Sequence, residues 1–364
     1  MDYGKGMGII AVVAIHAGLS QLVDYSFALM VYFFFITGYN FTPGKRTLSE
    51  NIRGRIKTVY IPFFKMAVMA AFLEIARAIY FGYGGYEMFR PGLCFSVYGA
   101  GLVPKLMPFM NEMDRIFSYN SNAVIYDGII PLNCHLWFLA AMFSGCVLFY
   151  TYIEKIRKDK WYDWPAIVIM LLIAGLEGPD IPQLPLSMGR GCLACACMIA
   201  ATRVREWRIF TDSSRRILAI IVATTVLAFA CLNGVFQTTM IVSLYAGGHP
   251  LGAAITFLGG ISATILAIFL LQIIEKFIDS PTLSFIGRNT MTIYLWNLIL
   301  DTIFSVVVVK ATGNEIVMDE FNMALFTSDS YGSIAAVTVL TMITATFMAK
   351  YKETHKDSLH AKLI

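Results

Sequence analysis

The chain consists largely of long apolar stretches, separated in most places by short polar or charged turns. A helix needs about 20 predominantly apolar residues to cross the hydrocarbon core of a bilayer. The chain has 364 residues, of which 57% are hydrophobic and only 14% are charged, so an ordinary soluble domain is excluded. The sequence therefore predicts an all-α integral membrane protein.

The apolar stretches and the turn signals between them predict about ten transmembrane helices. The expected spans are 4–23, 27–42, 59–81, 135–153, 164–176, 188–202, 217–232, 250–274, 290–309 and 332–349. The long segment 82–133 is rich in Gly, Pro and aromatic residues, and we expect it to form an extracytoplasmic cap between the third and fourth spans. We interpret residues 1–350 as a single membrane domain and residues 351–364 as a basic cytoplasmic tail.

The positions of Lys and Arg predict the orientation in the membrane. Most of the 28 Lys and Arg residues lie in the C-terminal tail and in the loops after the second, fourth, sixth and eighth spans. Loops rich in Lys and Arg remain on the cytoplasmic side. Both termini are therefore expected in the cytoplasm, and the protein is expected in a bacterial-type cytoplasmic membrane or a plasma membrane.

The first predicted span carries ionisable residues that a lipid-facing helix would exclude. Lys5 and His16 are eleven positions apart, which places them on nearly the same helix face about 16 Å apart along the axis. An ionisable group at membrane depth is costly unless it pairs or lines a wet cavity, which makes His16 a candidate functional residue. The alternative is a structural histidine that only hydrogen-bonds a neighbouring helix. Asp2 is expected to pair with Lys5.

A series of motifs in this chain resembles the integral-membrane enzymes of acyltransferase family 3. The motifs are Lys5 with His16, Phe-Phe-Ile-Thr-Gly-Tyr at 34–39, Arg55 with Pro62, His-Leu-Trp-Phe-Leu at 135–139, and Phe-Ile-Gly-Arg-Asn-Thr-Met-Thr-Ile-Tyr at 285–294. Two features depart from the family pattern. Asn297 stands where the closing motif usually continues to a histidine, and no esterase-like second domain is visible, so direct transfer and hand-off to another protein both stay open.

The resemblance implies an acetyl-CoA-dependent O-acyltransferase that uses cytoplasmic acetyl-CoA and acylates a hydroxyl of an extracytoplasmic or lipid-linked glycan. In that reaction His16 would act either as a general base or as a transient carrier of the acyl group. The sequence does not separate these two routes. Gly4, Gly6 and Gly8 would either allow close helix packing or leave room along the first helix for the pantetheine arm of the donor.

The phosphates of coenzyme A require cations on the cytoplasmic side. Lys5, Arg53, Arg55 and Lys57 are the expected donor-binding residues, with Arg55 matching the arginine of the family motif. Orientation by the positive-inside rule is the alternative explanation for Arg53 and Lys57.

Four further residues are candidates for binding the acceptor: His135, Trp137, Arg190 and Glu74. His135 and Trp137 begin a predicted span at the outer interface, where aromatic residues are also common for structural reasons. Arg190 would stabilise an oxyanion or bind an acidic sugar, or would only extend to the interface.

Two other functions compete with the enzyme. A secondary transporter of a polar or acylated solute would use His16, Glu74 and Arg77 as a relay, and an accessory scaffold would not need His16. Besides the donor and acceptor, membrane lipids are expected partners, and homo-oligomers are left open. The net charge of only +4 gives no reason to expect nucleic acid. No metal site is predicted, because Cys192 and Cys195 lie in a small-residue run suited to helix packing.

Overall fold

The computed structural model is helical through most of the residues that it describes. These are residues 2–19, 26–81, 136–176, 185–232, 250–278, 280–312 and 331–355. The α-helices are α1 (Asp2–His16), α2 (Ser26–Tyr39), α3 (Leu48–Arg55), α4 (Ile61–Phe81), α6 (Trp137–Thr151), α7 (Asp163–Leu176), α8 (Met188–Glu206), α9 (Ser213–Leu232), α11 (Pro250–Phe277), α12 (Pro281–Arg288), α13 (Thr290–Thr312) and α14 (Tyr331–Thr354).

Each predicted span coincides with one of these α-helices, although some of the helices are longer or shorter than predicted. Five of the described helical stretches are long and apolar enough to cross a membrane by length and composition. They are Leu48–Leu73, Trp137–Ile156, Gly252–Phe277, Thr290–Thr312 and Tyr331–Thr354. The chain therefore has the helices of an integral membrane protein, while the count of ten spans and the orientation remain predictions.

The first helix is shorter than predicted. α1 ends at His16 and is followed by a turn in which Gly18 has a φ of 114°, a backbone conformation that glycine adopts without strain. The prediction of a helix up to residue 23 is therefore wrong at its C-terminal end. His16 lies in the last turn of α1, at the point where the chain leaves the helix.

Two helices occur where the sequence analysis expected only loops. α3 begins after Thr47, whose hydroxyl accepts from the backbone N–H of Glu50 while the Glu50 carboxylate accepts from the backbone N–H of Thr47. This reciprocal capping box is a known helix start signal. α12 begins after Ser280, whose hydroxyl caps Leu283, with Pro281 as its first residue. Both signals are visible in the sequence.

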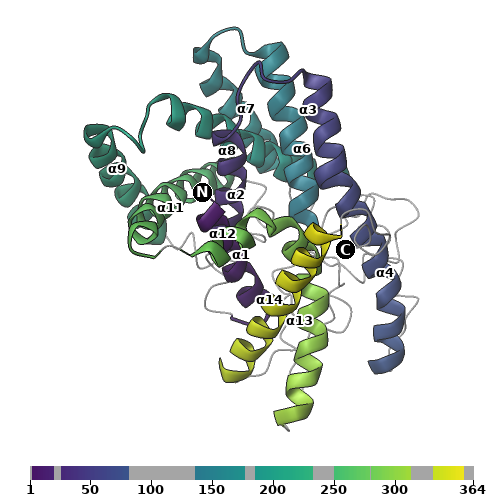
Figure 1. The fold of residues 1–364 in the computed structure, drawn as a ribbon. Helices are drawn as coiled ribbons and strands as arrows, with labels where there is room; N and C mark the ends of the chain where they lie inside the picture. The colour runs from purple at the N-terminus through teal and green to yellow at the C-terminus, as the bar shows by residue number, and fades with distance from the viewer. Residues whose placement is uncertain are drawn as a thin grey trace.

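α1 packs against α2, α12, α13 and α14, and it lies in the middle of the molecule (Figure 1). A side chain at Gly6 would overlap the backbone of Leu283, and one at Gly287 would overlap the backbone of Asp2. Only glycine allows α1 and α12 to approach this closely. At Gly6 the structure therefore supports close helix packing rather than room for the pantetheine arm.

α8 forms a second centre of packing, against α2, α6 and α7. Its cysteines at 192, 195 and 197 are buried and form no disulfide with one another. They fill the helix interface, as predicted for this small-residue run.

The charged residues near the ends of α6 and α8 form a network around one buried carboxylate. Asp163 is fully buried and accepts hydrogen bonds from the Tyr152 hydroxyl at 2.7 Å and from Arg157 at 2.7 Å. Arg157 and Arg203 also contact the Glu206 carboxylate, at 3.5 and 3.1 Å. Cations that were counted for membrane orientation are thus also held by carboxylates in the folded chain.

The predicted cap, 82–133, lies outside the described residues. The predicted tail begins inside α14, because this helix continues to Thr354. Residues 356–364 lie outside the part of the chain that the structure describes.

Candidate active site

His16 and Asn297 form a buried pair between α1 and α13. The Asn297 side-chain nitrogen lies 2.8 Å from His16 Nδ1. His16 is 6% exposed, and Asn297 is fully buried. The amide therefore occupies the position in which the family pattern usually has a histidine, and it contacts the candidate catalytic ring directly.

The Asn297 amide acts on which nitrogen of His16 carries the proton, because it contacts Nδ1. If the amide N–H donates to Nδ1, the neutral imidazole carries its proton on Nε2. If the amide oxygen faces the ring, it accepts from Nδ1–H and leaves the Nε2 lone pair available as a base. The orientation of this amide thus favours one tautomer of His16, and only the tautomer with Nδ1–H has an Nε2 that can accept a proton.

Arg190 and Trp137, both predicted as acceptor-binding residues, lie against each other. The Arg190 guanidinium is buried and lies 4.5 Å from the centre of the Trp137 ring. A cation over an indole ring is favourable, and more so away from water. The structure therefore brings together two candidate residues, Trp137 from α6 and Arg190 from α8.

An aromatic cluster connects this pair to α13. The Phe138 ring lies 6.2 Å from the Trp137 ring, 5.0 Å from the Phe34 ring and 5.5 Å from the Tyr294 ring, measured between centroids. Phe34, Phe138 and Tyr294 belong to three of the motifs identified in the sequence. Segments far apart in the chain therefore meet within one turn of Asn297.

The chain immediately before α8 has an unusual backbone conformation. Leu186 and Ser187 both have positive φ values, 58° and 49°, which are uncommon for residues other than glycine. The Ser144 hydroxyl donates a 2.6 Å hydrogen bond to the Leu186 carbonyl oxygen. This contact with α6 holds the segment that positions Arg190.

Lys5 pairs with Asp2, as the sequence predicted. The Lys5 ammonium lies 3.0 Å from the Asp2 carboxylate, and both side chains are partly exposed. The pair lies at the start of α1, at the opposite end of this helix from His16.

The three cations of the α3 region do not converge. Arg55 points toward α6, where its Nε donates to the Tyr150 hydroxyl at 2.8 Å. Arg53 and Lys57 are exposed. The arginine of the family motif is therefore hydrogen-bonded to Tyr150, a residue that was not predicted from the sequence as part of the site.

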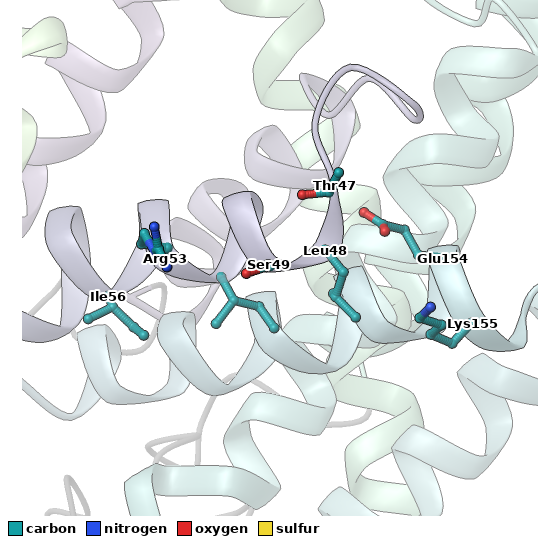
Figure 2. Close-up of a pocket in the computed structure, with 8 residues that line it drawn as sticks. Thr47, Leu48, Ser49, Arg53, Ile56, Glu154 and Lys155 are labelled. Atoms are coloured by element: carbon teal, nitrogen blue, oxygen red, sulfur yellow. The ribbon is translucent and has the colours of Figure 1, made fainter.

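A groove of about 780 Å³ lies between α3 and the end of α6 (Figure 2). Arg53 and Lys155 supply its cations, Glu154 supplies a carboxylate, and Leu48, Ile52 and Ile56 supply much of its apolar lining. From the sequence, Lys155 was only one of the loop cations that predict the orientation of the chain in the membrane. Lys5 does not line this groove, so the predicted donor-binding residues are divided between two places.

Some predicted residues cannot be placed. His135 lies outside the described residues, and the side chains of Glu74 and Arg77 are not described, although both belong to α4.

The order of the motifs along the chain agrees with a comparison against protein families. A family model for the acyltransferase domain of family 3 matches residues 1–349, which is nearly the whole chain. The chain belongs to acyltransferase family 3. No curated protein and no solved structure matches it. The acyltransferase thus combines a family assignment over nearly its full length with a His16–Asn297 pair between its first and penultimate described α-helices.

Proposed function

We propose that this acyltransferase transfers an acetyl group from cytoplasmic acetyl-CoA to a hydroxyl of an extracytoplasmic or lipid-linked glycan. The observation that carries the proposal is the buried His16, held by Asn297 at the end of α1. The family assignment supports acyl transfer in general. In this proposal the chain crosses the membrane ten times, with both termini in the cytoplasm.

His16 activates the acceptor in the general-base route. Its unprotonated ring nitrogen takes the proton of the acceptor hydroxyl while the hydroxyl oxygen attacks the thioester carbonyl carbon. The C–S bond then breaks, and the protonated His16 returns the proton to the departing thiolate, which leaves free coenzyme A and neutral His16. In the acyl-carrier route the same nitrogen attacks the carbonyl first, the C–S bond breaks, and coenzyme A leaves as its thiolate. The acceptor oxygen then attacks the acetyl carbon, the bond between this carbon and the ring nitrogen breaks, and that nitrogen takes the hydroxyl proton.

The groove beside α3 is our proposed contact for the phosphates of the donor. Its volume of about 780 Å³ is in the range of small-molecule sites. Arg53 and Lys155 offer charge to phosphate, and the apolar residues beside them offer contact area. Arg55 contributes through Tyr150 to the position of α3 against α6.

The Arg190–Trp137 pair is our proposed contact for the acceptor. A buried guanidinium held over an indole ring offers donors to sugar oxygens or to an acidic sugar. In support of this proposal, the Phe138 ring lies near both the Trp137 ring and the ring of Tyr294, which belongs to the helix that carries Asn297.

The test compares wild type, His16→Ala and His16→Gln in nanodiscs supplied with radiolabelled acetyl-CoA. Wild type is expected to consume the thioester, and both variants are expected to lose about 100-fold or more of this activity, the usual contribution of general-base catalysis. Thr225→Val on α9, where the hydroxyl only bonds its own helix backbone, is the control and should keep wild-type activity.

Two results would contradict the proposal. If wild type neither binds nor consumes acetyl-CoA, the donor assignment fails. If His16→Ala keeps full turnover, the catalytic role of His16 fails while the family assignment stands. Label that remains on denatured wild-type protein, and is absent from His16→Gln, would identify the acyl-carrier route.

A further inference from the structure

α13 carries a second buried polar group one helical turn beyond Asn297. Asp301 is fully buried, and its Oδ1 accepts a 2.6 Å hydrogen bond from the Thr341 hydroxyl of α14. Residues four apart on a helix are neighbours on one face, about 6 Å apart along the axis. Asp301 therefore faces the same interface as the amide that contacts His16.

Three oxygen atoms on this face have no hydrogen-bond partner among the described residues: Oδ1 of Asn297, Oδ2 of Asp301 and Oγ of Ser305. The Asn297 and Asp301 oxygens are the two nearest His16 along α13. Leaving a buried polar atom unsatisfied is costly, so neighbouring unsatisfied atoms normally share a proton, a donor or a water molecule. As placed, both atoms are acceptors and cannot bond to each other.

Two arrangements satisfy both atoms. In the first, a protonated Asp301 donates to the amide oxygen, the amide N–H donates to His16 Nδ1, and the imidazole proton is on Nε2. In the second, the amide is reversed, so that an ionised Asp301 accepts from the amide N–H while the amide oxygen accepts from His16 Nδ1–H. The oxygen and nitrogen of a side-chain amide are distinguished by such hydrogen-bond networks.

We propose that Asp301 is a positioning residue that acts through Asn297 to keep the proton of neutral His16 on Nδ1. This inference rests on the proposed function, because only the second arrangement gives His16 a basic Nε2. Asp301 does not touch the reacting atoms in this role. Thr341 holds one oxygen of the carboxylate and thereby fixes the direction of the other.

The charge of Asp301 also has a use during the reaction. A buried ion is costly unless hydrogen bonds and an opposite charge compensate it. When His16 takes the hydroxyl proton it becomes an imidazolium, and the ionised Asp301 then supplies the opposite charge across one amide. The relay Thr341–Asp301–Asn297–His16 is neutral at that stage, which favours the proton transfer.

The experiment measures acetyl-CoA turnover and the His16 tautomer in full-length protein in nanodiscs. Asp301→Asn keeps the size of the side chain but can no longer be ionised. We expect its kcat to fall about 10- to 100-fold with little change in KM for acetyl-CoA. Asp301→Glu, which keeps the charge, should recover part of the lost kcat. Thr302→Val is the matched control on the same helix, because the Thr302 hydroxyl donates to the backbone of its own helix at Leu298 and not to the relay.

The tautomer is read from 15N NMR of histidine-labelled protein. The chain has five histidines, and the His16 signal is identified by its loss in His16→Gln. The proposal expects Nδ1–H in wild type and a shift toward Nε2–H in Asp301→Asn. If Asp301→Asn does not fold, Thr341→Val, which removes only the hydroxyl donor, should show the same shift to a smaller degree.

Three results would overturn the inference: wild-type His16 protonated on Nε2, unchanged kcat in folded Asp301→Asn, or an equal loss of kcat in Thr302→Val. If wild type does not consume acetyl-CoA at all, the proposed function fails instead. In that case the NMR comparison still tests the relay by itself.

Discussion

At the scale of single residues, the most informative position is Asn297. The sequence showed it only as a departure from the family pattern, and the structure places its amide 2.8 Å from His16. An amide can replace a histidine here because both offer a donor and an acceptor to a neighbouring ring nitrogen. This contact could not be derived from the sequence, because it joins residues from helices at opposite ends of the chain.

Replacing Asn297 tests this contact. Asn297→Leu removes the hydrogen bond to His16 while keeping a side chain of similar size, and we expect a loss of turnover of about tenfold, the effect of a buried hydrogen bond. Asn297→His restores the usual residue of the family pattern and should retain more activity than Asn297→Leu. Initial rates of acetyl-CoA consumption measure both. Equal activity in Asn297→Leu and wild type would contradict a role for the amide.

Glu206 makes a second prediction at this scale, on stability. Partial burial raises the pKa of Glu206, but the hydrogen bond from Lys160 and the charges of Arg157 and Lys160 outweigh it, so the pKa lies below its usual value of 4.5. A carboxylate with a lowered pKa in the folded state stabilises the protein above its unfolded-state pKa. This contribution is lost as the pH falls below 4.5 and through the lower folded-state value.

We therefore expect the melting temperature of wild type to fall as the pH is lowered below about 4.5, by a few degrees more than that of Glu206→Gln. Melting curves in detergent across this pH range provide the measurement. Glu353→Gln, at an exposed position on the last turn of α14, is the control and should fall in parallel with wild type. A parallel fall in Glu206→Gln would show that the network does not depend on its ionisation.

At the scale of helices, the sequence predicted the apolar helices and missed the polar ones. Apolar length identified the regions of α4, α6, α11, α13 and α14, because a membrane span is defined by composition over many residues. α3 and α12 are short, and their start signals, Thr47 with Glu50 and Ser280 with Pro281, are local. The end of α1 was misplaced because hydropathy continues past Gly18, where the backbone leaves the helical conformation.

The contact between α1 and α12 gives a prediction at this scale. Gly287→Ala places a methyl group against the backbone of Asp2, which cannot move as a flexible side chain can. Overpacking of this kind costs about 1–3 kcal/mol, so we expect a lower melting temperature and lower turnover. The control is Gly54→Ala on α3, where an added carbon meets nothing within 4 Å. That variant should be neutral or slightly stabilised, by about 0.5–1 kcal/mol. Unchanged stability in Gly287→Ala would contradict the close packing.

At the scale of the whole molecule, the motifs that are scattered through the sequence come together in space. α1 packs against α12 and α13, while Phe34, Phe138 and Tyr294 join α2, α6 and α13 (Figure 1). The order of the motifs could be recognised from sequence, but their convergence depends on packing between distant segments. The donor-binding cations show the limit of sequence reasoning, because Lys5 pairs with Asp2 while Arg53 lines a separate groove beside α3.

This separation gives the molecule two sides. α3 and the adjoining ends of α6 and α7 lie at one end of the molecule, and α13 extends toward the other (Figure 1). In the proposed orientation the first end faces the cytoplasm. The donor would then approach from the side of the groove, and the acceptor would bind at the Arg190–Trp137 pair.

The central claim is tested most directly by sided acetyl transfer in proteoliposomes. Radiolabelled acetyl-CoA is added to the face on which a C-terminal tag is accessible, and a glycan acceptor mixture is enclosed on the other face. The account predicts that label appears on the enclosed glycans with wild type, and that His16→Gln reduces this transfer about 100-fold or more. Absence of labelled glycan with active donor supply, or equal transfer by His16→Gln, would contradict it.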